Sequence, residues 1–596
     1  MNLPAWLDLK PHIRGVFGFQ TSNRGWYTAF KCGVAVGLPV LIGQALGDPI
    51  FGLLAFTGSF SSQYGFGASG RLRVRLMVGA SVFLVMATLV GWVTAGIPGL
   101  TILAMATTAF LATLTATTFK IGPPAAFYMV MAVGLTNRLI DGGVDPWRLL
   151  GAVCVGAVIG VAMGLSDLLF DRFGPERQAV EDAETCIESF ATNRNPKLAS
   201  SMQQRCAAAV NDAWTMVTDA GWAVESYDRK VEHRTLDKLG HRLLAVHSRY
   251  LRIVSALATG EGLSDGNAMV LPRRHTRETS LGRPGIGTMI AGALTWPSEP
   301  LLIAMRNWIG VSLAGLIGLS LGPDRINWPA AFTVLMLHTG GSRVGQTHRS
   351  IQRLIGTFLG VGLYTLLAMW NPQGVWLAVV LAVSQALTTY LLPRNYAVAV
   401  APITAMTMLI VAHASGLAPA HTFSVVLIQD RLVDNTISVV SALIVVWLTF
   451  RHTSVAFLRA YARRVVEAAE QVLDDLALGR QETRRARRDR QALYITLLEA
   501  DMVAKRAMAD DDHKGDPNAH GANAYASMTQ ALQTFGYQVL GYCWAPDPID
   551  RSPFIAAGDA LSSITNRAVR RPRTPDELES DIVAARDHLD RITYER

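Results

Sequence analysis

Residues 76–118 read LMVGASVFLVMATLVGWVTAGIPGLTILAMATTAFLATLTATT, and none of these side chains is charged. A second uncharged segment covers residues 354–393. Each segment is about twice as long as the ~20 apolar residues that one helix needs to cross a bilayer. Each contains a turn signal near its middle, Ile97-Pro98-Gly99 in the first and Asn371-Pro372-Gln373-Gly374 in the second. Each segment therefore predicts two membrane-spanning helices joined by a tight turn.

The composition of the chain places these segments in a larger alternating pattern. Only 17% of the 596 residues are charged, against ~25% in an average globular protein. The shortage of charge is confined to two blocks, and an ordinary charge density follows each block. We therefore expect five parts: a cytoplasmic N-terminal segment (1–25), a first transmembrane repeat (26–170), a first cytoplasmic helical domain (171–300), a second transmembrane repeat (301–450) and a second cytoplasmic helical domain (451–596).

Apolar runs predict six spans in each block. They cover residues 26–46, 49–63, 76–97, 100–118, 123–137 and 147–169 in the first block, and 305–321, 327–340, 354–370, 375–392, 396–412 and 428–450 in the second. The second span of each block is short, so whether it crosses the membrane stays open. The expected fold class is an all-α membrane protein with two parallel repeats of six transmembrane helices.

Basic residues predict the orientation of the spans, because loops rich in Lys and Arg stay in the cytoplasm. The cations at 71–75, Lys120, the loop 343–353 and Arg394 fall on one side if every span is real. Both termini and both soluble segments then lie in the cytoplasm. Apolar residues in these soluble segments recur at helical spacing, for example at Leu236, Leu239, Leu243 and Val246, which predicts helices packed on helices. Two stretches, 260–287 and 510–523, have the composition of loops.

Several motifs that resemble ligand sites lack the context that such sites need. Residues 65–70 match the glycine pattern of dinucleotide-binding proteins but follow a membrane span instead of a strand. His233, His241 and His247 are not one helical turn apart, so they form no metal pair, and we expect them to be solvated. No basic face carries base-stacking aromatics, so nucleic acid is not an expected partner. We expect no cofactor, no metal and no enzymatic activity.

Ionisable groups inside membrane spans are costly, so they usually face a bundle interior or a wet path. Those in the predicted spans include Lys31, Arg148, His338, Arg431 and Asp434. They are candidates for a substrate pathway.

Two further candidates, Lys120 and Arg394, stand at the cytoplasmic ends of the fifth spans, which prolines interrupt. A cytoplasmic anion would meet them first, although they could also serve only to set the topology.

Arg148 and Arg431 occupy equivalent places in the two predicted repeats. Steps of four from Arg148 lead along small residues to Gly164, which predicts close helix packing on that face. Two arginines related by the repeat could line one central pathway and attract carboxylates. Alternatively, Arg431 and Asp434, one turn apart, only neutralise each other, or Arg431 reaches the membrane boundary. Asp434 is also a candidate proton carrier.

Three motifs of the second block resemble the fusaric acid resistance and aromatic acid exporter family. They are Trp328-Pro329, the run from Arg349 to Gly360, and Arg431-Leu432-Val433-Asp434. The order of six spans plus a cytoplasmic domain, made twice, is also similar. The first block departs from the pattern, because Gly151 stands in the place of Asp434. The first block therefore lacks the acid that a mechanism with a symmetric pair of acids would need.

The resemblance implies a multi-pass exporter of aromatic carboxylic acids in the bacterial inner (plasma) membrane, often working with a periplasmic adaptor subunit. Efflux of small organic anions, driven by the membrane potential or the proton motive force, is the first hypothesis. A plant family of malate-conducting channels is also similar over one six-span unit, so a passive organic-anion channel is the second. A membrane scaffold that recruits partners through its cytoplasmic domains is the third. The substrate and the oligomeric state stay open.

Overall fold

A computed structural model describes residues 18–19, 25–122, 124–193, 196–222, 234–259, 282–283, 285–296, 298–338, 343–414, 421–449, 453–509, 525–545, 547–565 and 574–593. Within these ranges all regular structure is helical. The expected N-terminal segment and the two expected loops at 260–287 and 510–523 lie wholly or largely outside them. The expectation of an all-helical fold is confirmed for these described residues.

The chain divides into two compact units. Unit 1 contains the two apolar blocks, with residues 1–68, 72–172 and 285–451. Unit 2 contains residues 69–71, 173–284 and 452–596, and so combines helices from both soluble segments.

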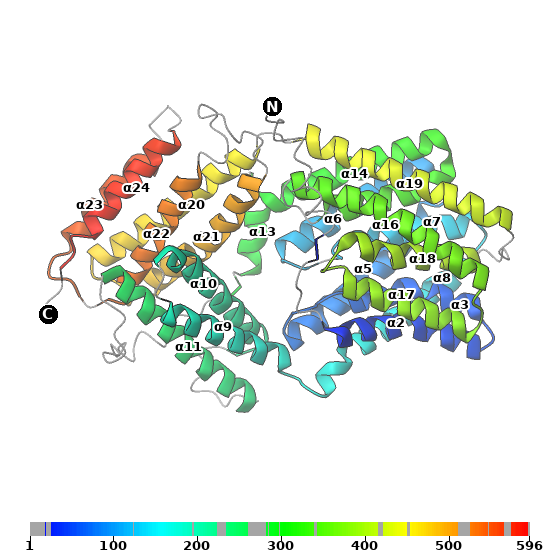
Figure 1. Cartoon of the computed structure of the whole chain (residues 1–596), viewed down its shortest axis with the longest axis horizontal. Coiled ribbons are helices and arrows are strands. Elements are labelled where there is room, and N and C mark those ends of the chain that lie inside the picture. Colours follow the sequence, from blue (N-terminus) through cyan, green and yellow to red (C-terminus); the bar gives the residue numbers. More distant parts are fainter. Residues whose placement is uncertain are drawn as a thin grey trace. The chain divides into compact units, whose positions relative to one another are not determined.

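The helices of unit 1 follow the predicted apolar runs closely (Figure 1). The first block forms α2 (Trp26–Ala45), α3 (Pro49–Leu54), α4 (Phe56–Ser59), η2 (Phe60–Gln63), α5 (Gly70–Val93), α6 (Pro98–Thr118), α7 (Phe127–Asp141), α8 (Pro146–Leu165) and η3 (Ser166–Leu169). The second forms α14 (Glu299–Leu321), η5 (Pro323–Arg325), α15 (Asn327–Leu337), α16 (Arg343–Trp370), α17 (Val375–Leu391), α18 (Tyr396–Ala414) and α19 (His421–Leu448). Helix α13 (Ile286–Leu294), from the end of the expected first cytoplasmic domain, also belongs to unit 1.

Eight of these helices are long and apolar enough to cross a membrane, namely α2, α5, α6, α8, α14, α16, α18 and α19. The expectation of six full spans in each block is therefore confirmed only in part. Helix α17 has 17 residues, α7 has 15 and α15 has 11. The segment 49–63 is divided among α3, α4 and η2. At 1.5 Å per residue, 11 residues cover only about 17 Å of a ~30 Å hydrocarbon layer.

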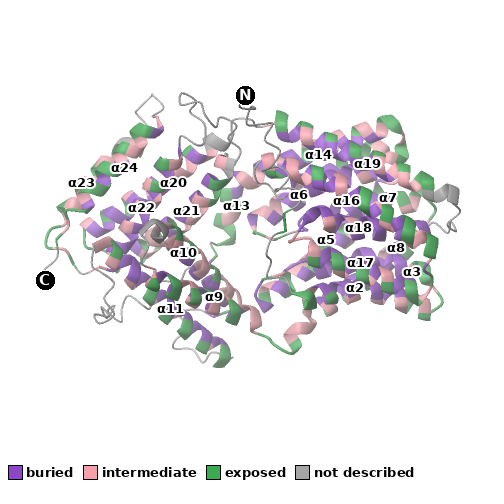
Figure 2. Ribbon diagram, in the orientation of Figure 1, coloured by how far each residue is buried: buried purple, intermediate pink, exposed green. Residues whose placement is uncertain are grey.

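The short helices α7 and α15 are buried inside unit 1. They contact each other, and almost every residue of α15 is buried. Helix ends at membrane depth expose backbone N–H and C=O groups, which is tolerated only where protein or a wet cavity surrounds them. The burial of α7 and α15 meets this condition. Figure 2 shows the same contrast, with buried residues between the helices and exposed residues on the outer faces.

The outer faces of the long helices are apolar. On α5, the exposed residues include Val78, Val82, Phe83 and Met86, which lie on one face at helical spacing. In water this stripe would be turned inward, whereas lipid favours its exposure. This pattern agrees with a membrane-embedded unit.

Helices from the two blocks pack against each other in reciprocal pairs. Helix α2 lies along α17, and α14 lies along α6 (Figure 1). In the first pair, Gly33 and Gly37 bring α2 against the backbone of α17 at Ala382, where a Cβ atom would collide. Small residues at such contacts let membrane helices approach closely.

Unit 2 is a helical bundle made of α9 (Gly174–Thr192), α10 (Pro196–Asp219), α11 (Arg234–Thr259), α20 (Thr453–Ala477), α21 (Arg484–Ala509), α22 (Ala526–Tyr542), α23 (Ser552–Thr565) and α24 (Pro575–Leu589). One apolar core joins the two soluble segments, with Trp214 and Tyr250 from the first and Leu497 and Phe535 from the second. The predicted stripe of α11 is buried in this core.

One histidine in unit 2 departs from the sequence-based expectation. His247 is buried, and the indole N–H of Trp214 donates a hydrogen bond to its Nδ1 atom at 3.1 Å. Burial lowers the pKa of His247 to about 3. The expectation that this residue is solvated is therefore wrong, because its place on α11 faces the core. His241 is partly exposed beside Asp237, and His233 lies outside the described residues.

Candidate functional site

A cavity of about 110 Å³ lies inside unit 1. Its lining comes from α7, α16 and α18, from the C-terminal ends of α15 and α17, and from the turns before α7 and after α17. Its wall is mostly apolar, with aromatic rings from Phe127, Tyr128 and Tyr396. A cavity of ~150 Å³ holds benzene in another protein. The volume here is therefore of the order of one aromatic ring.

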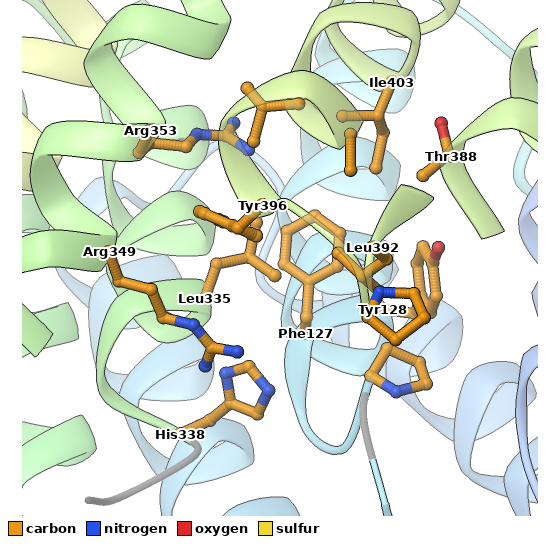
Figure 3. A pocket seen from close by; sticks show the side chains of 14 residues that line it. Phe127, Tyr128, Leu335, His338, Arg349, Arg353, Thr388, Leu392, Tyr396 and Ile403 are labelled. Atoms are coloured by element: carbon orange, nitrogen blue, oxygen red, sulfur yellow. The ribbon is translucent and has the colours of Figure 1, made fainter. Parts of the chain in front are cut away.

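Two arginines of α16 line this cavity, Arg349 and Arg353. They are four residues apart, so they lie on one face of the helix. Figure 3 shows both guanidinium groups at the same side of the cavity, with the Tyr396 ring between them. A guanidinium presents several N–H donors in a plane that matches a carboxylate. The arrangement combines paired cations with an aromatic wall.

Arg353 is buried and is held in place by two contacts. Its side chain is only 2% exposed. Its Nε atom donates a hydrogen bond to Oδ1 of Asn435 on α19 at 2.9 Å. Its guanidinium carbon lies 4.1 Å from the centroid of the Phe332 ring on α15. These contacts orient the charge without neutralising it, because neither Asn435 nor Phe332 is anionic.

Arg349 lies one turn closer to the start of α16. Its guanidinium carbon is 5.4 Å from the centroid of the Tyr396 ring. Figure 3 also shows the Arg349 guanidinium beside the imidazole of His338. The Tyr396 hydroxyl is buried and has no hydrogen-bond partner in the part of the chain that the structure describes. A polar ligand in the cavity would satisfy such a group.

His338, a predicted site residue, lines the same cavity. Its Nδ1 atom lies 2.8 Å from the carbonyl oxygen of Val334, so Nδ1 carries a proton and donates. Its Nε2 atom is buried without a partner among the described residues. In neutral imidazole, Nε2 is an acceptor. The cavity therefore offers one acceptor for a ligand O–H group besides its cationic donors.

A second, much smaller cavity of about 10 Å³ lies between α7 and α15. Residues Leu135 and Arg138 near the end of α7 meet Asn327 and Trp328 at the start of α15. In the larger cavity, the start of α7 meets the end of α15. The two helices therefore run antiparallel, and the two cavities lie in series along their contact. We call this contact the α7/α15 seam.

Arg431 on α19 lies beside the seam. Its guanidinium carbon is 4.2 Å from the centroid of the Trp328 ring and 5.2 Å from that of Phe332. Its Nη1 atom is buried without a hydrogen-bond partner within the described ranges. Phe332 is thus flanked by Arg353 and by Arg431. A buried, desolvated cation over an aromatic face gains about 2 kcal/mol.

Asp434, one turn beyond Arg431, is 5% exposed. Its Oδ1 atom has no hydrogen-bond partner in the residues described. The nearby Asp430 pairs with Arg325 of η5. Arg431 and Asp434 lie close enough for their opposite charges to interact, so their mutual neutralisation, one of the alternatives from the sequence, stays a prediction.

Arg148 occupies a different environment from Arg431. Its side chain is 44% exposed, and Nη2 lies 2.6 Å from Oδ1 of Asp48, the N-cap of α3. The ladder of small residues that follows it on α8 is buried, and Gly156 packs directly on the backbone of Ala55. The predicted close packing of this face is confirmed. The guanidinium links the first turn of α8 to the N-cap of α3. It does not line the larger cavity.

Lys31 is buried in a charged cluster of the first block. Its Nζ atom lies 2.7 Å from Oδ1 of Asp167, and Nη1 of Arg73 lies 2.8 Å from Oδ2 of the same carboxylate. One carboxylate thus bridges two cations, which offsets much of the cost of burying them.

Lys120 and Arg394 lie at helix ends. Lys120 follows α6, is exposed and has a φ of 52°. Arg394 lies in the turn between α17 and α18, where Nη1 donates to the carbonyl oxygen of Tyr390 at 2.6 Å. Its guanidinium stacks on the Tyr390 ring at 3.7 Å. Arg394 is next to Pro393, which lines the larger cavity.

Of the predicted site residues, only His338 lines the larger cavity, while Arg431 lies on the rings beside the seam. Arg349, Arg353 and Tyr396 line the cavity but are not among the site residues predicted from the sequence. The spacing of the two arginines is a signal for such a site, because two arginines four residues apart in an apolar helix share one face.

The eight long apolar helices among the described residues define a multi-pass membrane protein. Within this class, residues 313–445 match the family described as "Fusaric acid resistance protein-like". This match confirms the resemblance seen in the motifs of the second block. The chain is also similar to the "Uncharacterized membrane protein YvaC" of Bacillus subtilis (strain 168), with 24% identity over 579 residues that cover 89% of this chain and 88% of that protein. No solved structure matches the chain significantly.

Proposed function

We propose that this protein exports small aromatic carboxylate anions from the bacterial cytoplasm across the inner membrane. The observation that carries the proposal is the cavity of unit 1, in which Arg349 and Arg353 face aromatic rings in a space of about 110 Å³. The match of residues 313–445 to the fusaric acid resistance protein-like family supports a transport role. We infer a transporter and not an enzyme.

The cavity suits both parts of such a substrate. The carboxylate would bind the guanidinium groups of Arg349 and Arg353, and the ring would pack on Phe127 and Tyr396. His338 would accept a hydrogen bond from a ligand hydroxyl or a protonated carboxyl group. Because a buried arginine is costly in a membrane, two of them beside one cavity favour a functional role over a structural one.

The α7/α15 seam supplies a route beyond the cavity. Arg353 and Arg431 both lie against Phe332, so a carboxylate that leaves Arg353 would next meet Arg431. Arg138, which lines the smaller cavity, is the following cation along the seam. Phe332 is buried and lines neither of the two cavities, so a substrate that passes between them would have to displace its ring. We therefore propose Phe332 as the constriction of the pathway.

Two features support two equivalent halves that share this pathway. The reciprocal pairs α2–α17 and α14–α6 join the same positions of the two blocks. The ends of α2 and α14 also repeat a motif, Leu41-Ile42-Gly43 with Leu46-Gly47 and Leu316-Ile317-Gly318 with Leu321-Gly322. With six segments in each half, both halves would face the same way, and the termini and unit 2 would be cytoplasmic.

The membrane potential is a sufficient energy source. One negative charge that leaves a cell at ~150 mV, inside negative, gains roughly 3.5 kcal/mol. This energy sustains a concentration ratio of a few hundredfold. Electrogenic export therefore requires no proton carrier, although Asp434 would be the first candidate for one.

The test is efflux of preloaded benzoate from cells that express wild-type protein, Arg353→Gln or Arg148→Gln at matched levels. We expect Arg353→Gln to lower the efflux rate by at least about tenfold, the effect of losing a charge-assisted hydrogen bond. Arg148→Gln, which changes an arginine outside the cavity, should keep the wild-type rate. Wild-type efflux from Arg353→Gln would contradict the proposed site. Equal efflux with and without the protein would contradict transport of this substrate class.

A further inference from the structure

Unit 2 contains a cavity of its own, which transport through unit 1 does not use. Its volume is about 360 Å³. It lies between α10 and α11 of the first soluble segment and α22 and α24 of the second. A space of this size between four helices accommodates a small molecule.

Two polar groups at this cavity lack partners. Tyr537 is 4% exposed, and its hydroxyl forms no hydrogen bond among the described residues. Burial raises the pKa of Tyr537, so the hydroxyl keeps its proton and can donate. The side-chain carbonyl oxygen of Gln538 is also buried without a partner in the described parts of the chain. A ligand that offers both an acceptor and a donor would satisfy the two groups.

The orientation of the Gln538 amide is set by its neighbour. Its Nε2 atom donates a hydrogen bond to Oδ1 of Asp590 at 2.7 Å. This contact leaves Oε1 as the acceptor. Asp590 and the Oε1 atom of Gln538 therefore place two acceptors on the same part of the cavity wall, which favours a cationic donor such as an ammonium group.

An arginine lies near these acceptors. Arg586, one turn before Asp590 on α24, also lines the cavity. Its Nε atom is 3.8 Å from Oδ2 of Asp590, so the two form a loose ion pair. A ligand that carries both charges would pair with each residue at a shorter distance. A pure anion would meet the Asp590 carboxylate, and a pure cation would meet Arg586.

The rest of the cavity wall is partly apolar, with Val254, Leu257 and Ala258 on α11. These side chains would accept the hydrocarbon part of a ligand. We propose that this cavity binds a small zwitterion, an α-amino acid with an apolar side chain. Its carboxylate lies at Arg586 and Tyr537, and its ammonium group lies at Asp590 and Gln538. Because the site joins helices of both soluble segments, the ligand holds these segments together.

The test measures binding to the purified full chain in detergent by titration calorimetry. The probes are L-phenylalanine, 3-phenylpropanoate, which lacks the ammonium group, and 2-phenylethylamine, which lacks the carboxylate. L-Leucine and L-methionine test the tolerance for other apolar side chains. We expect at least one amino acid to bind, and each truncated probe to bind at least about tenfold more weakly than L-phenylalanine or not at all.

Two variants locate the binding. Tyr537→Phe removes one oxygen and should weaken binding of the amino acid by about fivefold or more, and Asp590→Asn should weaken it by about tenfold. Asp587→Asn, an exposed carboxylate on α24 outside the cavity, is the matched control and should bind like wild type. The proposal is overturned if no amino acid binds below about 10 mM, if the three phenyl probes bind equally, or if both cavity variants bind like the control. Because 3-phenylpropanoate is itself a small aromatic carboxylate, every titration is repeated with Arg349→Gln/Arg353→Gln, which removes the anion site proposed in unit 1. Binding that persists in this variant reports on the cavity of unit 2, so the outcome is independent of the function proposed for unit 1.

Discussion

The guanidinium carbon of Arg353 lies 4.1 Å from the centroid of the Phe332 ring, and Arg431 lies on the same ring at 5.2 Å. This relationship joins α16, α15 and α19 at one buried point. It also places two cations at one aromatic residue. A cation over an aromatic face is stabilised while its N–H groups stay available. Arg353 is thereby prepared to bind an anion.

The first prediction concerns the kind of cation at position 353. Arg353→Lys keeps the positive charge but loses the planar donor set and the Nε contact with Asn435. We expect the apparent affinity for benzoate in efflux assays to fall by about tenfold, with a smaller change for the maximal rate. The concentration dependence of benzoate efflux from proteoliposomes checks this. An unchanged affinity would show that charge alone, and not the guanidinium geometry, holds the substrate.

The second prediction concerns the driving force. In proteoliposomes with a potassium-diffusion potential, the steady-state benzoate ratio should change about tenfold for each ~60 mV, because one charge moves with each turnover. Asp434→Asn should keep this dependence, since the potential suffices without a proton carrier. A ratio that follows the pH gradient and ignores the potential would contradict electrogenic export.

A passive channel would give the same equilibrium ratio, so a separate recording distinguishes it. We expect purified protein in a planar bilayer to carry benzoate current without resolvable unitary steps. Discrete openings would favour the channel alternative over a carrier.

The third prediction concerns the two repeated turns. A Cβ atom on Gly43 would lie 2.7 Å from the Asp48 carbonyl oxygen, and one on Gly318 would collide with the Arg325 carbonyl. Gly43→Ala and Gly318→Ala should therefore each lower stability by about 1–3 kcal/mol, the cost of overpacking a tight contact. Gly362→Ala on α16 is the control, because a Cβ there meets nothing within 4 Å. Melting temperatures in detergent measure the three effects. If Gly43→Ala and Gly318→Ala melt like Gly362→Ala, the turns are not close-packed.

The fourth prediction concerns the acid sensitivity of unit 2. The pKa of His247 is lowered from 6.5 to about 3 by burial, so below pH 6.5 the unfolded chain binds a proton that the folded chain does not. The contribution of His247 to the free energy of unfolding is therefore complete above pH 6.5. It falls by about 1.4 kcal/mol per pH unit as the pH drops toward 3.

His247→Gln should flatten this loss between pH 6.5 and 5 in thermal unfolding of the full chain. His241→Gln, at a partly exposed position of the same helix, is the matched control. Its free energy of unfolding should depend on pH with the same slope as that of wild type. Equal slopes for all three proteins would contradict the account of His247.

The sequence predicted the long helices well, because an uncharged apolar run has few alternatives to a membrane helix. It did not show that residues 49–63 form three short pieces. The reason is local packing: Asp48 caps α3, and Gly58 lies against the backbone of α8 at Val153. Contacts of this kind depend on the partner helix, so the apolar pattern of one segment does not predict them.

The missed arginines have a similar explanation. The span predicted from the sequence begins at residue 354, which leaves Arg349 and Arg353 in a boundary loop whose charges set the topology. Helix α16 begins instead at Arg343. Arg353 is therefore ten residues into the helix, about 15 Å along its axis. The cavity also needs α7 and α18, which lie far from α16 in sequence, and only the fold brings these together.

The most direct test of the central claim is binding of benzoate to purified protein, measured by titration calorimetry. The account predicts that wild type binds benzoate and that Arg349→Gln/Arg353→Gln binds it at least about tenfold more weakly. Benzyl alcohol, which lacks the carboxylate, should bind both proteins more weakly than wild type binds benzoate. Equal affinity of the wild type and the double variant for benzoate would contradict the assignment of this cavity as the anion site.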